Sequence, residues 1–366
     1  MELKQVNNSA ILPVVRTDEF EQNELEILSV KQPKSENEIF PFDFELIDAE
    51  EIIQPIEMVN EISSEHFITS NTEPILLDEL KNKCIIPVFS KDNESTISHS
   101  EFINTVAEIG STFFSGERML QPSIKVSHPI KGRIPEAMGK AVKDLMEDEK
   151  TIYYERMAFM IEFPNIAETI NGNKLSLSIG GVRSYNHENL YSRKIEEHFK
   201  VFIGFKNHVC TNLCISTDGF KKEIRVKSLS DLAFEVYQLL AEFKTDRHLN
   251  QLHQLGDYSL TERQFAQLLG KSRMYQYLPL NQKKSIEPIP INDSQISSIA
   301  REYYQDKSFS RNTNGDIDLW RLYNLFTGAN KTSYIDTFLD RSVGCLDFVQ
   351  SIANQLESGV NSWYIS

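Results

Sequence analysis

The chain has 366 residues, of which 40% are hydrophobic and 25% are charged, with 13 Tyr, 22 Phe and only 15 Gly. This composition excludes collagen-like, mucin-like and wholly disordered proteins, and no apolar run reaches the roughly 20 residues that span a bilayer. The net charge of −15 lies mostly in residues 1–100, which hold 21 acidic and 7 basic residues, so a basic face on the nearly neutral remainder is not excluded.

Residues 1–95 are predicted to form the first of three parts, an acidic and weakly structured N-terminal arm. Asp and Glu are dense there, and Asn and Pro interrupt the segment repeatedly. One interpretation is a solvated arm with short segments docked on the body. The other is an acidic flap that shields a basic surface.

The N-terminal sequence and the cysteine content bear on the compartment. The first residues lack the basic start and the long apolar stretch of a signal peptide. Four cysteines in a chain of this length do not make a disulfide scaffold. We therefore expect a reduced, cytoplasmic protein without a membrane segment.

Residues 96–228 are predicted to form an α/β core. Apolar residues at helical spacing predict a helix over 98–114, with Ser98 or Ser100 as the N-cap. Pro135 at a first turn predicts a short helix over 135–146. The Gly180-Gly181 pair indicates a bulge or a close backbone approach. Strands are expected over residues 123–130, 151–163, 174–185, 198–210 and 224–226.

Residues 229–366 are predicted to be helical and to pack on the core. A capping box at Ser259–Glu262 opens one helix, for which Gly270 is the expected stop. The helices are expected over 229–243, 262–269, 296–304, 319–326 and 335–356. Strands followed by helices, without regular alternation, predict an α+β fold with a mainly antiparallel sheet of about five strands.

Motifs for catalysis, metals and nucleotides are weak in this sequence. No glycine-rich dinucleotide fingerprint is present, and His208, Cys210 and Cys214 lack the second ligand pair that a structural zinc site needs. Core cysteines are the favoured interpretation, so we predict no metal site and no cofactor. A polar pocket near Glu155, Arg156 and Arg183 is the basis of an alternative enzyme hypothesis.

Basic residues with aromatic neighbours give the leading functional hypothesis. If 220–227 is a strand, Lys221, Arg225 and Lys227 project from one face. Cationic grooves with stacking aromatics hold single-stranded nucleic acid. The alternative interpretation of these residues is an ordinary solvated sheet face with charges of both signs. The predicted nucleic-acid-binding residues are Lys131, Arg133, Arg183, Lys206, Lys221, Lys222, Arg225 and Lys227.

Six segments occur in an order that is similar to a known family: SHPIKGRIPEA (127–137), TIYYERM (151–157), SIGGVRSYN (178–186), FIGFKNHVCTN (202–212), STDG (216–219) and WRLYN (320–324). They resemble an uncharacterised bacterial family of unknown function that is associated with mobile elements, and more distantly the phage/plasmid-like protein family. His208 departs from the distant family, in which Arg precedes Val-Cys-x-Asn. The resemblance implies a bacterial, cytoplasmic protein linked to plasmid, phage or transposon biology, and it carries over no catalytic residues.

Together these observations predict a non-enzymatic, nucleic-acid-associated protein of the single-strand binding or annealing type. The alternatives are an enzyme with the polar pocket named above and an interaction protein that acts on host factors through the acidic arm. The oligomeric state is left open.

Overall fold

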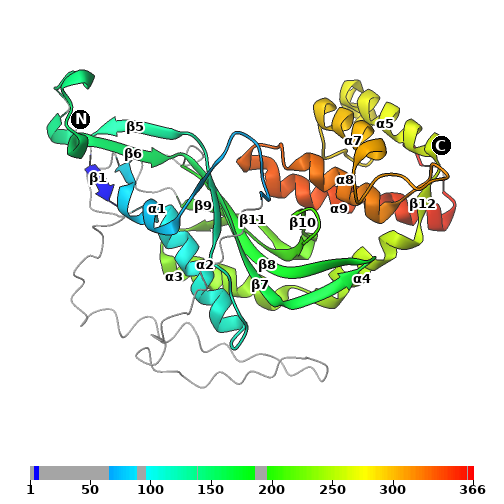
Figure 1. The fold of residues 1–366 in the computed structure, drawn as a ribbon, viewed down its shortest axis with the longest axis horizontal. Helices are drawn as coiled ribbons and strands as arrows, with labels where there is room; N and C mark the ends of the chain where they lie inside the picture. The colour runs from blue at the N-terminus through cyan, green and yellow to red at the C-terminus, as the bar shows by residue number, and fades with distance from the viewer. Residues whose placement is uncertain (1–3, 8–65, 89–95, 138, 186–195, 361) are drawn as a thin grey trace.

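The structure is a computed structural model that describes residues 4–7, 66–88, 96–137, 139–185, 196–360 and 362–366. It confirms the predicted α+β class: a curled antiparallel sheet is followed along the chain by a helical C-terminal half (Figure 1). Most of the predicted acidic arm lies outside the described residues. The division into three parts at residues 95 and 228 stays a prediction.

The main sheet has seven strands in the described part of the chain, in the order β10-β9-β8-β7-β4-β2, with β11 also pairing with β9. Its strands are β2 (Glu73–Ile75), β4 (Ser123–Val126), β7 (Arg156–Ile170), β8 (Asn173–Ser184), β9 (Glu197–Asn207), β10 (Leu213–Cys214) and β11 (Phe220–Val226). Three two-stranded sheets pair β1 (Lys4–Asn7) with β3 (Ile85–Val88), β5 (Pro129–Arg133) with β6 (Lys150–Tyr154), and β12 (Ser259–Leu260) with β13 (Ile317–Asp318).

Helices cover both faces of the main sheet and build the C-terminal half. They are α1 (Leu77–Lys83), α2 (His99–Phe113), α3 (Leu229–Glu242), α4 (Thr245–Gln254), α5 (Glu262–Tyr277), α6 (Leu280–Lys283), α7 (Asp293–Gln305), α8 (Leu319–Asn330) and α9 (Ile335–Ser358). Short 3-10 turns are η1 (Pro135–Ala137), η2 (Val142–Asp144), η3 (Glu147–Glu149), η5 (Thr217–Gly219) and η6 (Leu255–Asp257). No helix in the described ranges is long and apolar enough to cross a membrane.

Burial on both faces explains why the central strands are nearly continuous in apolar residues. One face packs Phe159 of β7 and Phe199 of β9 against Phe102 of α2, with ring centroids 5.1 and 4.8 Å from the Phe102 ring. The other face packs Met160 and Phe202 with the start of α9 and the segment around Phe67. The sheet is therefore the middle layer of the fold.

The predicted close approach at Gly180-Gly181 is confirmed. A methyl group at Gly180 would overlap the Phe159 carbonyl, and one at Gly181 would overlap the Phe102 ring. Glycine is required at both positions because neighbouring strands and α2 occupy the space of a Cβ atom.

Several predicted elements differ in their boundaries. The helix over 98–114 is confirmed as α2, and Ser98 caps it through a capping box with Glu101. The helix over 135–146 is wrong, because η1 and η2 occupy that range and Gly139 lies between them. The stop at Gly270 is also wrong: α5 continues to Tyr277, since Ser272 beyond the glycine stays buried against the core.

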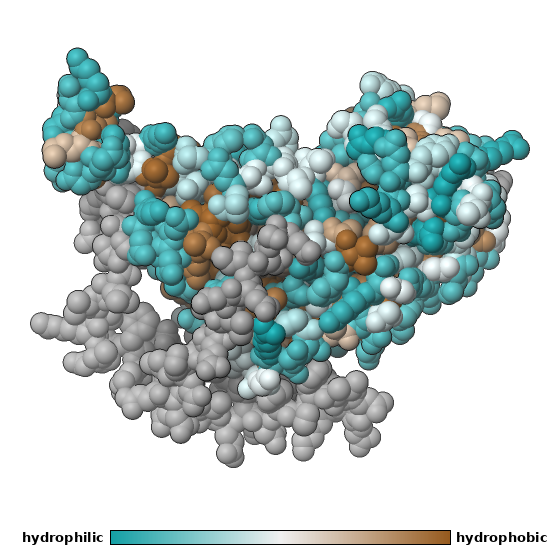
Figure 2. Space-filling model, in the orientation of Figure 1, coloured by the Kyte–Doolittle hydropathy of each residue, from teal (hydrophilic) through white to brown (hydrophobic). Residues whose placement is uncertain are grey.

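A two-stranded arm projects from the body of the fold (Figure 1). The predicted strand over 123–130 divides into β4 in the main sheet and β5, and β5 pairs with β6 over Pro129–Arg133. The arm formed by residues 129–154 (the β5–β6 arm) projects from the body at the end opposite α5 and α7 (Figure 1). Val142 and Met146, in the segment that joins β5 to β6, are exposed. Figure 2 shows hydrophobic atoms at the surface of the outer end of the arm.

Candidate functional site

Two of the eight predicted nucleic-acid-binding residues are buried in the sheet. Arg183 is 1% exposed, pairs with Glu197, and holds its guanidinium 4.4 Å from the centroid of the Phe199 ring. Lys206 is 3% exposed, and its Nζ lies 3.0 Å from Oε2 of Glu162. Because neither cation reaches the surface, neither contributes to an exposed basic face of the free protein.

The basic residues of β11 do not form the predicted row. The pairing of β11 with β9 shifts register between Lys221 and Ile224, and this irregularity divides the side chains between two faces. Lys221 pairs with Glu235 of α3 at 3.1 Å, and Lys222 pairs with Asp340 of α9 at 2.9 Å. Two further predicted residues, Arg225 and Lys227, are exposed, and Arg225 lies 3.2 Å from Glu223.

The remaining two predicted residues, Lys131 and Arg133, lie together on the β5–β6 arm. Lys131 is opposite Ile152, and Arg133 is opposite Lys150. Directly opposed residues in an antiparallel pair share a face, so Lys131, Arg133 and Lys150 lie on one side of the arm. Tyr154 of β6, opposite Pro129, follows on the same side and is half-buried.

The polar pocket of the enzyme hypothesis is not assembled by the described residues. Arg156 is opposite Ser184 in the β7–β8 pair, whereas Arg183 is opposite Met157, so the two arginines lie on different faces of the sheet. Arg156 pairs with Glu155 at 3.0 Å and with Asp336 at 2.7 Å. These groups form ion pairs between the sheet and α9.

A buried ionic cluster that the sequence did not indicate joins three adjacent strands: Glu162, Ser176, Lys206 and His208. Ser176 Oγ donates to Glu162 Oε1 at 2.7 Å, and Nε2 of His208 lies 2.9 Å from Ser176 Oγ and 3.2 Å from the same Glu162 oxygen. In a catalytic triad, serine and carboxylate use different ring nitrogens of the histidine. Here both contact Nε2, so the arrangement holds the sheet together and does not activate the serine.

Other nucleophiles and bases in the core are held in their neutral forms by burial. Burial raises the pKa of the Cys210 thiol to about 11 and that of Cys84 to about 12. Burial also lowers the pKa of His99 to about 3 and that of His248 to about 4. At neutral pH these cysteines are thiols and these histidines are uncharged, which is typical of core residues.

Two of the segments that carry the family resemblance meet in an asparagine cluster formed by Asn207, Asn212 and Asn324. Asn207 Nδ2 donates to Asn324 Oδ1 at 3.1 Å, and Asn212 Nδ2 donates to the Asn324 carbonyl at 2.9 Å. Thr211, in the turn between them, has a φ of 58°. A β-branched residue rarely adopts this conformation, and the surrounding hydrogen bonds hold it.

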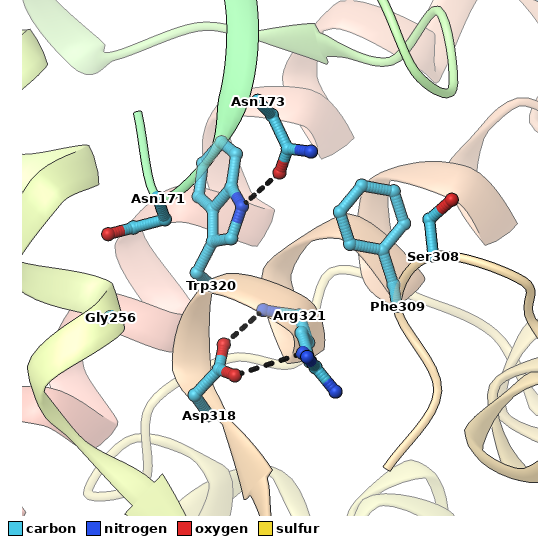
Figure 3. A pocket seen from close by; sticks show the side chains of 8 residues that line it. All are labelled: Asn171, Asn173, Gly256, Ser308, Phe309, Asp318, Trp320 and Arg321. Carbon is cyan, nitrogen blue, oxygen red and sulfur yellow. Dashed lines mark hydrogen bonds and ion pairs between the residues drawn. The ribbon is translucent and has the colours of Figure 1, made fainter. Parts of the chain in front are cut away.

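A cavity of about 200 Å³ lies one helical turn from this cluster (Figure 3). Trp320 and Arg321, at the start of α8, form one wall, and Asn173, at the start of β8, forms another. Trp320 Nε1 donates to Asn173 Oδ1 at 2.7 Å, and Arg321 pairs with Asp318 at 3.1 Å. Asp318 also lines the cavity, together with Asn171, Gly256, Ser308 and Phe309. We call this space the Trp320 cavity.

The comparisons with known proteins give a family and no function. A family model described as "Domain of unknown function, B. Theta Gene description (DUF3871)" matches residues 47–365. No curated protein and no solved structure matches the chain. The matched range includes the sheet, the β5–β6 arm and the C-terminal helices.

Proposed function

The chain belongs to the DUF3871 family of unknown function, and we propose that it is a binding protein that holds single-stranded nucleic acid on its β5–β6 arm. The family match confirms the expected uncharacterised family. The link to mobile elements and the cytoplasmic location stay predictions.

The observation that carries this proposal is the grouping of Lys131, Arg133 and Lys150 on one side of the β5–β6 arm. Among the described residues, Lys131 lies in no ion pair and is exposed. Cations spaced along a projecting strand pair can follow successive phosphates, and the half-buried Tyr154 at the base of the same side adds an aromatic ring.

The ion pairs at the outer end of the arm do not prevent such binding. Lys150 pairs with Glu147 at 2.5 Å, but the two side chains are 42% and 90% exposed. An exposed ion pair contributes about 0–1 kcal/mol, so a phosphate can replace the carboxylate at small cost. The buried pairs of Arg183 and Lys206 are different, because separating them would leave a charge in the core.

Fluorescence anisotropy with a labelled oligothymidylate longer than about 16 nucleotides, the upper end of known site sizes, tests the proposal at low salt. The test variant is Lys131→Glu with Arg133→Glu. The matched control is Arg225→Glu with Lys227→Glu, which makes the same change of charge at the C-terminal end of β11 and the residue after it.

We expect the wild type and the control to bind with similar affinity and the arm variant to bind at least about tenfold more weakly. Binding that the two variants weaken equally would reflect net charge alone and would contradict the proposal. No binding by the wild type would also contradict it. In that case the apolar end of the arm, with Val142 and Met146, would favour a protein partner.

A further inference from the structure

The lining of the Trp320 cavity includes the side chains of Asn173 and Arg321, which carry hydrogen-bond donors. Figure 3 shows Asn173 above the gap between the rings of Trp320 and Phe309, with Arg321 below the indole. Both rings are nearly buried, at 2% and 3% exposure, so they form firm walls and leave polar groups at the opening.

Trp320 fixes the orientation of the Asn173 amide. The indole nitrogen is a donor only, so the atom that it contacts at 2.7 Å must be the amide oxygen. The Nδ2 group of Asn173 therefore points away from the indole (Figure 3). It donates to no atom of the described residues, so its hydrogen-bonding capacity is available to a ligand.

Arg321 supplies a second donor, and its acidic neighbour is already engaged. Asp318 Oδ1 accepts from the Arg321 backbone N–H at 2.8 Å, and Oδ2 lies 3.1 Å from Arg321 Nε. Arg321 Nη1 donates to the Ser310 carbonyl at 2.8 Å. These contacts hold the guanidinium in place and leave the N–H groups of Nη2 without a protein acceptor in the described residues.

We propose that the Trp320 cavity binds a small carboxylate, with Asn173 Nδ2 and Arg321 Nη2 as donors and Ser308 Oγ at the rim. A carboxylate accepts hydrogen bonds without donating any, which matches the donors that Asn173 and Arg321 offer. A single cation that is shared with Asp318 suits a singly charged anion better than a doubly charged phosphate. A volume near 200 Å³ equals roughly six water molecules in liquid water and therefore limits the ligand to a small acid or a chain end.

The carboxylate could belong to a free small acid or to the C-terminus of a peptide, and the experiment separates these sources. The protein contains only two tryptophans, Trp320 and Trp363. In a Trp363→Phe background, the fluorescence of Trp320 reports on the cavity. The probes are N-acetylglycine and its amide, which differ in the carboxylate alone, and a tripeptide with a free or an amidated C-terminus.

We expect saturable quenching by N-acetylglycine or by the free-acid tripeptide, and at least about tenfold weaker binding of the matching amide, which corresponds to about 1.4 kcal/mol. The stronger of the two acids identifies the source. Equal binding of acid and amide, or no saturation with either acid, would overturn the proposal.

Asn173→Asp is the sharpest variant, because one oxygen still accepts from Trp320 while the other replaces the donor with a second acceptor. We expect it to abolish binding of the acid, and a circular dichroism melt checks that it folds. Arg321→Gln, which removes the charge, is the second variant and is also expected to lose binding. Lys307→Gln removes an exposed neighbouring charge and should bind as the parent does. Unchanged binding in Asn173→Asp and Arg321→Gln would also overturn the proposal.

Discussion

Asn324 Oδ1 of α8 accepts a hydrogen bond from Asn207 Nδ2 at the end of β9, over a distance of 3.1 Å. Both side chains are buried, and Asn324 Nδ2 donates in turn to the Trp320 carbonyl at 2.9 Å. The two asparagines thus connect the sheet with the helix that lines the Trp320 cavity. Amide groups in this position satisfy backbone and side-chain partners that no water can reach.

Replacing Asn324 by Leu, which has a similar volume, should destabilise the protein. The change leaves Asn207 Nδ2 without its acceptor, and one such buried group costs about 1–3 kcal/mol, whereas the Trp320 carbonyl keeps the backbone hydrogen bond of the helix. Urea unfolding measures the loss as a lower midpoint at constant slope. Asn250→Leu, at an exposed position on α4, is the control. Equal midpoints for Asn324→Leu and wild type would show that the asparagine cluster does not support the fold.

The pair of Glu162 and Lys206 should show strong energetic coupling. Both side chains are at most 5% exposed, so Glu162→Gln leaves an unpaired charge in the core and should cost about 3–5 kcal/mol of unfolding free energy. The double variant Glu162→Gln with Lys206→Met removes both charges and should lose less than the sum of the single variants. A double-mutant cycle by urea unfolding measures this difference, and purely additive effects would rule out the pairing.

Stability should decline as the pH falls below about 6.5, partly because of His248. Burial lowers the pKa of His248 in the folded protein to about 4 from its ordinary value of 6.5. Between these two values the unfolded state binds a proton that the folded state excludes, so the free energy of unfolding decreases with decreasing pH. The burial of His99 acts in the same direction.

The variant His248→Phe tests this account, because the ring centroids of Phe205 and Phe243 already lie 5.6 and 5.8 Å from the imidazole. Urea midpoints measured from pH 7 to pH 4 should fall less steeply for this variant than for the wild type. The exposed His253, replaced by Phe, is the control and should keep the wild-type slope. An identical slope in His248→Phe would contradict the prediction.

The cysteines should react slowly in the folded protein. With the pKa of Cys210 raised to about 11, about one thiol in a thousand is ionised at pH 8, and the thiolate is the reactive form. Alkylation by iodoacetamide at pH 8 should therefore be at least about a hundredfold slower than in urea. Mass spectrometry of the labelled peptides gives the rate for each site. Labelling of Cys210 at the unfolded rate would indicate an activated thiol and would favour the enzyme hypothesis.

Local patterns in the sequence were sufficient to predict much of the fold. The spacing of apolar residues and the Ser98 cap located α2, and the Gly180-Gly181 pair marked the tight packing of β8. The order of strands and helices indicated the α+β class. The predicted helix boundaries were wrong where packing overrides the local preference of a residue. Glycine favours a helix end, but Gly270 lies inside α5 because residues on both sides of it are buried.

The candidate sites were harder to predict, because they depend on contacts between distant residues. Arg183 and Lys206 look like surface cations in sequence, but Glu197 on the adjacent strand neutralises Arg183, and Glu162, two strands away, neutralises Lys206. The shift of register in β11, which places Lys221 and Arg225 on different faces, is set by pairing with β9. The Trp320 cavity combines residues from 171 to 321, and no local pattern brings these together.

The salt dependence of oligonucleotide binding tests the central claim, that the β5–β6 arm holds single strands, most directly. Three phosphate contacts on a single strand predict a slope of about −2 for the logarithm of affinity against the logarithm of salt concentration. The variant Lys131→Gln with Arg133→Gln, which retains Lys150, should reduce that slope to about −0.7. A slope that is the same in this variant and in the wild type would show that nucleic acid, if bound at all, is held elsewhere than on the arm.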